Sequence, residues 1–419
     1  MKEYTKPSVL GLKRSFGFGD RLGLATPGHI DAISGSPFLP IFAQQSMREL
    51  KRTGRNPQNV MDAAKLAVKD ERWTKPWGAD ADHLQSRDAI NLMAANGYTL
   101  FTIDPSDHVE DAADKMPVER VKAKFETMIK TGQLSCPEIF DIYYQTNHEI
   151  DTDFTLRFSD TAELLRAIVK YGRAIEFSEA MSGWTTDAMG ENEFEVEISI
   201  DETQNPTSPL EHLFIGLELK RREVEIVSLA PRFIGAFEKG INYKGDLTVF
   251  EDQYSKHIAI AKYCGPYKLS IHSGSDKFSV YPIIGRLSGE LLHVKTAGTS
   301  YLEALRVVCR TDKGLFKDII EFSRKHFVED KFSYHVSASL SDVPDNISDT
   351  DLEKWYLETE AGRQILHVTF GSVLLSGKTY RGKNLKEHVL DNITDNGGLY
   401  REFLHFHLGK HFDLLLRDI

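Results

Sequence analysis

Residues 76–84 read PWGADADHL, an apolar run that ends in acidic and imidazole side chains just before the amphipathic stretch SRDAINLMAANG. A short apolar run followed by helical periodicity is typical of a β-strand that leads into a helix. Seven further runs of this kind occur in the first three hundred residues: 21–29 (RLGLATPGH), 38–46 (FLPIFAQQS), 98–107 (YTLFTIDPSD), 194–203 (FEVEISIDET), 224–233 (VEIVSLAPRF), 267–276 (YKLSIHSGSD) and 291–300 (LLHVKTAGTS).

Alternation of strands with helices indicates a parallel sheet. Eight such repeats are the number that closes a (β/α)₈ barrel. A doubly wound open sheet is the alternative, but no G-x-G-x-x-G follows any of the early strands. We therefore predict an α/β fold with a TIM-type barrel.

The spacing of the runs divides the chain into a barrel and two additions. We expect the catalytic barrel over residues 16–301. Helical patterns in residues 108–193 predict an insertion after the fourth strand, placed so that it covers the barrel mouth. Residues 302–419 are expected to form a mostly helical C-terminal extension packed on the barrel.

Composition restricts the classes of protein. The 419 residues are 41% hydrophobic, which is ample for a core, and carry a net charge of -11 without a dominant basic run. A nucleic-acid partner is therefore not expected. The first twenty residues lack the apolar core of a signal peptide, and no stretch approaches a membrane span. Three cysteines (Cys136, Cys264 and Cys309) form no CxxC pair, which favours a reducing cytoplasm. A homo-oligomer is possible.

The polar residues at the strand ends carry the expected chemistry, because the carboxyl ends of barrel strands converge on one mouth. His83 ends the third strand beside Asp82, and His272 ends the seventh. Two imidazoles beside carboxylates suit a divalent metal such as zinc, manganese, nickel or iron. A single histidine in either place would more often be a plain core or surface residue.

Other strand ends offer groups that suit a sugar or its carboxylate. Gln44 closes the second strand and can read hydroxyls, while Arg232 or Lys295 can hold a carboxylate. Asp276 follows His272 in a run of small residues whose backbone can approach an anion. Each of these also fits a turn, a helix cap or a surface ion pair. Two histidines beyond the barrel, His335 and His367, are expected to be structural.

Seven fragments of the chain, in order, resemble the tagaturonate epimerase family: SFGFGDRLGLATPGH (15–29), PIFAQQSMRELKRTGR (40–55), GADADHLQ (78–85), FTIDPSDHVEDAAD (101–114), EISIDETQNPTSPLEH (197–212), FIGAFEKGINYKGD (233–246) and HSGSDK (272–277). The resemblance covers most of the chain. It implies interconversion of tagaturonate and fructuronate, two keto-hexuronates that differ at carbon 4, with a divalent metal.

A looser likeness extends to the class II metal-dependent sugar aldolases, which are eight-stranded barrels with an Asp-His pair on the third strand. It implies that Asp82 carries the proton and that His83 and His272 bind the metal. Those aldolases carry a further histidine ligand on the sixth strand, where this chain offers only Arg232. Glu202, or its neighbour Asp201, is the candidate to replace that ligand; Glu202 is also the candidate second proton carrier.

The sequence therefore predicts a metal-dependent carbon 4 epimerase that acts by retro-aldol cleavage and re-addition. A metal-dependent aldolase for a keto sugar acid is the nearest alternative. A non-catalytic sugar-acid-binding protein is a third reading, and it would bind ligand without turnover.

Overall fold

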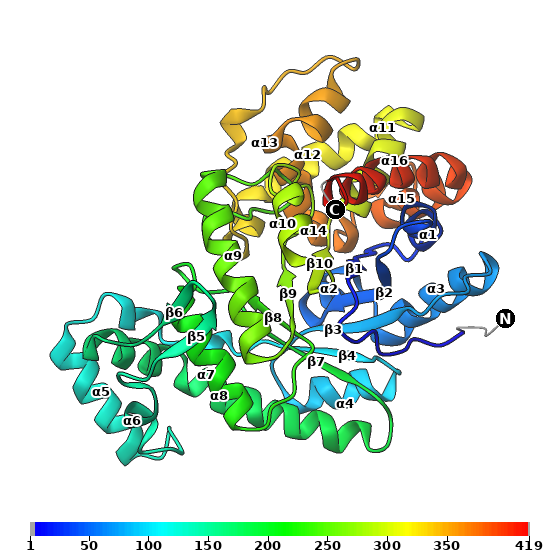
Figure 1. The fold of residues 1–419 in the computed structure, drawn as a ribbon. Coiled ribbons are helices and arrows are strands. Elements are labelled where there is room, and N and C mark those ends of the chain that lie inside the picture. Colours follow the sequence, from blue (N-terminus) through cyan, green and yellow to red (C-terminus); the bar gives the residue numbers. More distant parts are fainter. Residues whose placement is uncertain (1–4, 418–419) are drawn as a thin grey trace.

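The computed structural model describes residues 5–417 and shows a closed barrel of eight parallel strands (Figure 1). Around the barrel the strands are β1 (Ser15–Phe18), β2 (Leu39–Ser46), β3 (Gly78–Leu84), β4 (Leu100–Ile103), β7 (Glu195–Ile200), β8 (Ser228–Pro231), β9 (Lys268–Ile271) and β10 (Leu292–Thr296). Strand β1 pairs with both β2 and β10, which closes the barrel. The expected TIM-type architecture is confirmed.

The first strand lies earlier in the chain than the sequence predicts. Residues 21–29 were expected to form it, but β1 ends at Phe18 and the helix α1 (Thr26–Ile33) occupies the end of that run. The carboxylate of Asp20 accepts hydrogen bonds from the backbone N–H groups of Leu22, Gly23 and Ala25, and this turns the chain out of the sheet. Pro27 then starts the helix, because its fixed φ suits a first turn.

Helices cover the outside of the barrel, and their sequences signal where they begin. Asn56 and Ser208 form capping boxes with Asn59 and Glu211 at the starts of α3 and α8. The helices between the strands are α2 (Met47–Thr53), α3 (Pro57–Asp70), α4 (Arg87–Ala95), α8 (Pro209–Arg221), α9 (Leu247–Cys264) and α10 (Tyr281–Ser288). Their apolar faces pack on the strands in one continuous core.

The insertion after β4 is helical, as expected, with one added hairpin. It contains α5 (Val118–Lys130), α6 (Ile139–Tyr143), β5 (His148–Asp151), β6 (Phe154–Leu156) and α7 (Thr161–Met189). Helix α5 packs on α7, and α7 packs on α4 and α8 at the flank of the barrel (Figure 1). None of its residues lines either mouth cavity described below, so its covering of the barrel mouth remains a prediction.

The chain after β10 is mostly helical, as expected. It forms α11 (Thr299–Thr311), α12 (Lys313–Asp330), α13 (Glu360–Val368), α14 (Phe370–Leu375), α15 (Leu385–Asp395) and α16 (Gly397–Leu415), with a short pair of strands, β11 (Thr379–Tyr380) and β12 (Lys383–Asn384). Helix α16 packs on α1 and α10, so the end of the chain returns to the barrel wall. Within residues 5–417, no helix has the length and apolar character that a membrane crossing needs.

Candidate active site

The end of β3 carries an irregularity that turns one more side chain toward the mouth. Successive residues of a strand normally point to opposite faces. His83 has a positive φ of 53°, and the pairing with β4 shifts register between Ala81 and Leu84. An irregularity of this kind re-aims a side chain. Asp82 and His83 are therefore both able to line one cavity at the carboxyl end of the barrel.

The two histidines expected to meet do so. The ring centroids of His83 and His272 are 5.1 Å apart with an angle of 71° between the planes. His83 Nδ1 lies 3.2 Å from Asp104 Oδ2, and His272 Nδ1 lies 3.2 Å from Asp201 Oδ1. His272 Nε2 also contacts Glu197 Oε1 at 2.7 Å. Each imidazole is thus paired with a buried or half-buried carboxylate.

Lys295 stands at the floor of this cavity in a buried charge cluster. Its Nζ lies 2.6 Å from Asp80 Oδ2, 2.9 Å from Asp82 Oδ1 and 2.9 Å from Glu197 Oε1. Thr102 Oγ1 accepts a further hydrogen bond from it at 2.5 Å. Burial lowers the pKa of Lys295, but these carboxylates outweigh burial and raise it well above its usual value. The Lys295 charge is therefore already compensated inside the protein.

The same cluster shifts the pKa values of two carboxyl groups of β3, those of Asp80 and Asp82, in opposite directions. Burial raises the pKa of Asp80 to about 6, although Lys295 opposes the shift. Burial also raises the pKa of Asp82, but Lys295 and His83 outweigh it, so the net shift is downward. Asp82 is therefore held ionised, as a proton acceptor must be at neutral pH.

The electrostatics around the imidazoles favour positive charge. Burial lowers the pKa of His83, yet Asp82 and Asp104 outweigh burial and raise it to about 10. Burial likewise lowers the pKa of His272, and Asp201 is the main group that raises it to about 9. A metal ion competes with protons for the same ring nitrogens, so a place that stabilises two imidazolium charges also suits a cation.

The donor set at the mouth fits a divalent metal. His83, Asp104 and Glu202 each offer a ligand atom, and these three atoms lie within 4.8 Å of one another. His272 and Asp201 flank the same group. Imidazole and carboxylate donors suit zinc, manganese, nickel or iron.

Two cavities meet at these residues. The inner cavity is lined by Gln44, Asp82, His83, His272 and Lys295, among others. The outer cavity has a volume of about 430 Å³, and its lining includes Arg232, Phe332, Tyr334 and His335. Both cavities are lined by Asp201, Glu202, Lys239, His272 and Ser273. The mouth is therefore one continuous polar site with a deep and a shallow part.

Three of the four expected substrate-binding residues line this site: Gln44, Arg232 and Lys295. Gln44 Nε2 donates to Thr296 O at 3.0 Å, while its buried Oε1 has no hydrogen-bond partner in the described part of the chain. Gly17 makes room for that amide, since a Cβ there would lie 1.7 Å from Gln44 Oε1. Arg232 lines the outer cavity, and its Nη1 makes one long hydrogen bond of 3.5 Å to Asp201 O.

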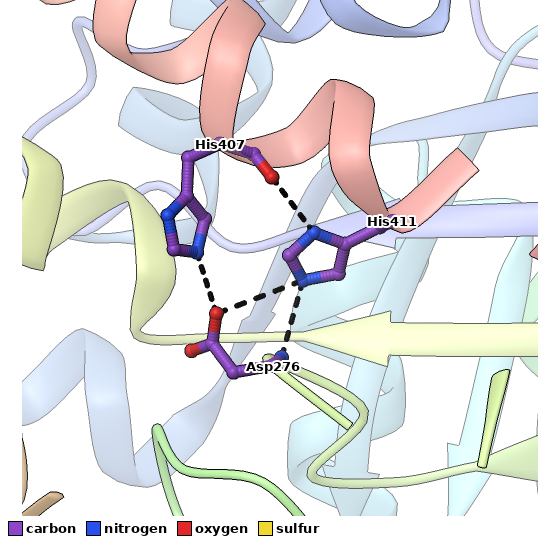
Figure 2. A group of neighbouring side chains, drawn as sticks. All are labelled: Asp276, His407 and His411. Carbon is purple, nitrogen blue, oxygen red and sulfur yellow. Dashed lines mark hydrogen bonds and ion pairs between the residues drawn. The ribbon is translucent and has the colours of Figure 1, made fainter. Parts of the chain in front are cut away.

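Asp276 lies beside His407 and His411 of α16, as Figure 2 shows. One carboxylate oxygen accepts from Arg363 Nη2 at 2.7 Å, and the other contacts His407 Nε2 at 2.5 Å. His411 Nδ1 donates to His407 O, and its Nε2 accepts from the Asp276 N–H, so both ring nitrogens are occupied. Asp276 thus ties α13 and α16 to the loop after β9. Asp276 lines neither of the two mouth cavities, where the sequence predicted it to contact substrate.

The C-terminal extension supplies mouth residues that the sequence did not reveal. Tyr334 lines both cavities, His335 lines the outer one and His367 lines the inner one; within the described part of the chain, the buried Nδ1 of His367 has no hydrogen-bond partner. The sequence predicted structural roles for His335 and His367 and did not place either of them at the mouth. Lys239, in the loop after β8, was also missed, although it lies in one of the fragments that carry the family resemblance. That fragment was the available signal, because Lys239 lies well beyond the end of β8 at Pro231.

A closed barrel with an acid-base cluster assembled at its mouth is the arrangement of a barrel enzyme. The family model for UxaE, tagaturonate epimerase, matches residues 1–415. The chain belongs to the tagaturonate epimerase family, and epimerases are isomerases.

Relatives support that membership over nearly the full length. The tagaturonate/fructuronate epimerase of Thermotoga maritima is 42% identical over 412 residues, which are 98% of this chain and 82% of the relative. The native crystal structure of the fructuronate-tagaturonate epimerase UxaE from Cohnella laeviribosi is 37% identical, with a TM-score of 0.92, and the match covers 98% and 83% of the two chains. A glycerol complex of the same protein gives 38% identity and a TM-score of 0.92 at the same coverage.

Proposed function

We propose that this chain interconverts D-tagaturonate and D-fructuronate by inverting carbon 4. The family and the printed activities of its relatives support the substrate pair. The observation that carries the chemistry is the shared cavity of Asp82, His83 and His272, in which an ionised carboxylate lies beside a place that favours a cation. Residues 16–301 are proposed as the catalytic barrel and residues 302–419 as an extension packed on it.

We propose that His83 and His272 hold a divalent metal together with a carboxylate. Glu202 remains the first candidate, and Asp104 and Asp201 are the other carboxylates in reach. When bound, such an ion would polarise the keto oxygen of the sugar and the hydroxyl next to it.

We propose that the reaction proceeds by cleavage of a carbon–carbon bond rather than by removal of a carbon-bound hydrogen. In a 2-ketose the hydrogen on carbon 4 is not alpha to the carbonyl, so its removal leaves an unstabilised carbanion. Cleavage between carbons 3 and 4 sends the electron pair of that bond toward the keto group and leaves an aldehyde at carbon 4. Re-addition to the other face of the aldehyde inverts that carbon.

The proposed role of Asp82 is to carry the proton in both halves of this reaction. Asp82 takes the proton from the carbon 4 hydroxyl as the bond breaks and returns it after the aldehyde fragment has rotated. Lys295, 2.9 Å away, keeps Asp82 ionised before the transfer. Glu202 is the candidate second proton carrier, and Gln44 and Arg232, which line the mouth cavities, are candidates for contact with the substrate.

The test is incubation of the purified protein with D-tagaturonate and a divalent metal, followed by NMR of the products. The proposal expects an equilibrium mixture with D-fructuronate. Accumulation of free aldehyde, detected with a coupled reductase, would instead identify an aldolase. Binding of the uronate without turnover under any divalent metal would contradict both enzyme readings.

A further inference from the structure

The loop after β8 is held from both sides by buried polar contacts. Lys277, which follows β9, donates through Nζ to Glu238 O at 2.7 Å and to Ile241 O at 2.6 Å. From the other side, Arg363 Nε of α13 donates to Gly240 O at 2.8 Å. Gln364 Nε2 donates to Glu238 Oε2, also at 2.8 Å. Lys239 lies between these contacts, so its backbone position is fixed.

The Arg363 contact connects this loop to the end of the chain. Asp276 accepts from Arg363. It also contacts His407 of α16, as Figure 2 shows. Arg363 thus touches both the Asp276 carboxylate and the backbone of the Lys239 loop. The C-terminal extension is in this way part of the scaffold that positions Lys239.

The ammonium group of Lys239 lacks a carboxylate partner. Its Nζ donates to Ser273 Oγ at 2.6 Å, and within residues 5–417 no carboxylate forms an ion pair with it. The other Lys and Arg side chains of the inner cavity are paired: Arg21 contacts Glu49 at 2.9 Å, Arg48 lies 3.9 Å from Glu202, and Lys295 has its three carboxylates. Lys239 is the cation of this group that has charge available for a ligand.

The surroundings of Lys239 make an anionic ligand favourable. Burial lowers its pKa, although the charges of Asp201, Glu202 and Glu49 oppose that shift. Lys239 is half-buried, and a charge-assisted hydrogen bond from a ligand carboxylate would offset the cost of removing its charge from water. Because Lys239 lines both cavities beside His272, a ligand held at the proposed metal site can place a carboxylate against it.

We propose that Lys239 binds the carboxylate group of the hexuronate substrate and that Arg363 and Gln364 of the C-terminal extension position it. The inference rests on the proposed function, since it assigns the place of the carboxylate within the same site. It differs from the sequence-based expectation, in which Arg232 or Lys295 held that group. Lys295 is already neutralised by three carboxylates, and Arg232 lines the outer cavity alone, whereas Lys239 lines both cavities.

The experiment compares Lys239→Met and Lys239→Gln with Lys239→Arg and with the matched control Lys256→Met. Lys256 lies on α9 in a surface pair with Asp252. A hydrogen bond to a charged group contributes about 1.5–3 kcal/mol, so the KM for D-tagaturonate should rise about 10- to 150-fold in the Met and Gln variants. The turnover number should change less than about threefold, because this binding is the same in ground and transition states. Lys239→Arg should recover part of the affinity, and Lys256→Met should match the wild type.

Two outcomes would overturn the inference while leaving the proposed function intact. One is an unchanged KM in folded Lys239→Met and Lys239→Gln with an active wild type. The other is a loss of turnover at unchanged KM, which would place Lys239 in the chemical step. If the wild type binds the uronate without turnover, the proposed function fails. The role of Lys239 is then tested by calorimetry, which compares the dissociation constants of the wild type, the Lys239 variants and Lys256→Met.

Discussion

The imidazole rings of His83 and His272 lie with their centroids 5.1 Å apart, although they come from the third and seventh strands of the barrel. Asp82 stands next to His83 and contacts Lys295 at 2.9 Å. The barrel thus brings a proton acceptor, a compensating cation and two candidate metal ligands into one cavity. The following predictions test each part of this arrangement.

Replacement of Asp82 by Asn should lower the turnover number by about 10²–10⁴-fold, because the proton of the carbon 4 hydroxyl loses its acceptor. Both histidines remain, so metal content should not change. Steady-state kinetics and metal analysis of the same preparation measure the two effects. Asp88→Asn, at an exposed position of α4, is the matched control. A fully active Asp82→Asn enzyme would contradict the assignment.

Turnover in deuterated water should leave carbon 4 free of deuterium. In the proposed cleavage, the hydrogen on carbon 4 stays attached as the aldehyde fragment rotates, and only the hydroxyl proton moves to Asp82. Proton NMR of the product after several turnovers measures the label. Efficient wash-in at carbon 4 would favour direct deprotonation and exclude the retro-aldol route.

Replacement of Lys295 by Met should destabilise the fold strongly. The change leaves Asp80, Asp82 and Glu197 at the cavity floor without their shared cation. Removal of one partner from a buried ion pair costs about 3–5 kcal/mol in free energy of unfolding. Urea unfolding measures this against Lys256→Met, and equal unfolding midpoints for the two variants would show that the cluster is not a stabilising unit.

Stability should fall in acid partly through Asp276. Burial raises the pKa of this carboxyl, but Arg363 and His407 outweigh burial and hold it well below its usual value of 3.8. A depressed carboxylate pKa adds stability above the unfolded-state value, and this contribution is lost as the pH falls through the folded-state value.

The Asp276→Asn variant isolates this contribution. Its deficit in unfolding free energy relative to the wild type should be constant above about pH 5 and should shrink as the pH falls below about 4. Urea unfolding midpoints across that range measure the deficit, with Asp88→Asn as control. A deficit that does not change with pH would show that Asp276 does not titrate in this way.

The fold was predictable wherever a strand is both apolar and followed by an amphipathic helix. Seven of the eight expected runs overlap a barrel strand. The remaining run, 21–29, was apolar enough for a strand, but the Asp20 side chain turns the backbone and Pro27 begins a helix. The true first strand, Ser15–Phe18, has only four residues and gives a weak periodic signal.

The sequence predicted Asp82, His83 and His272 at the site, because a position at the end of a barrel strand is enough to place a side chain at the mouth. The position of Lys239 depends on contacts that the distant residues Lys277 and Arg363 make with its loop, and no local sequence pattern predicts these contacts. Tyr334 reaches the mouth only because the extension folds back over the barrel. Long-range packing of this kind is not encoded in short-range periodicity.

The metal content of purified variants tests the central claim most directly. Elemental analysis should find about one divalent ion per chain in the wild type and in Asp82→Asn, and almost none in His83→Ala or His272→Ala, because each loses an imidazole ligand. His405→Ala, at an exposed position of α16, should retain the ion. An active wild type without bound divalent metal, or full occupancy in both histidine variants, would contradict the account.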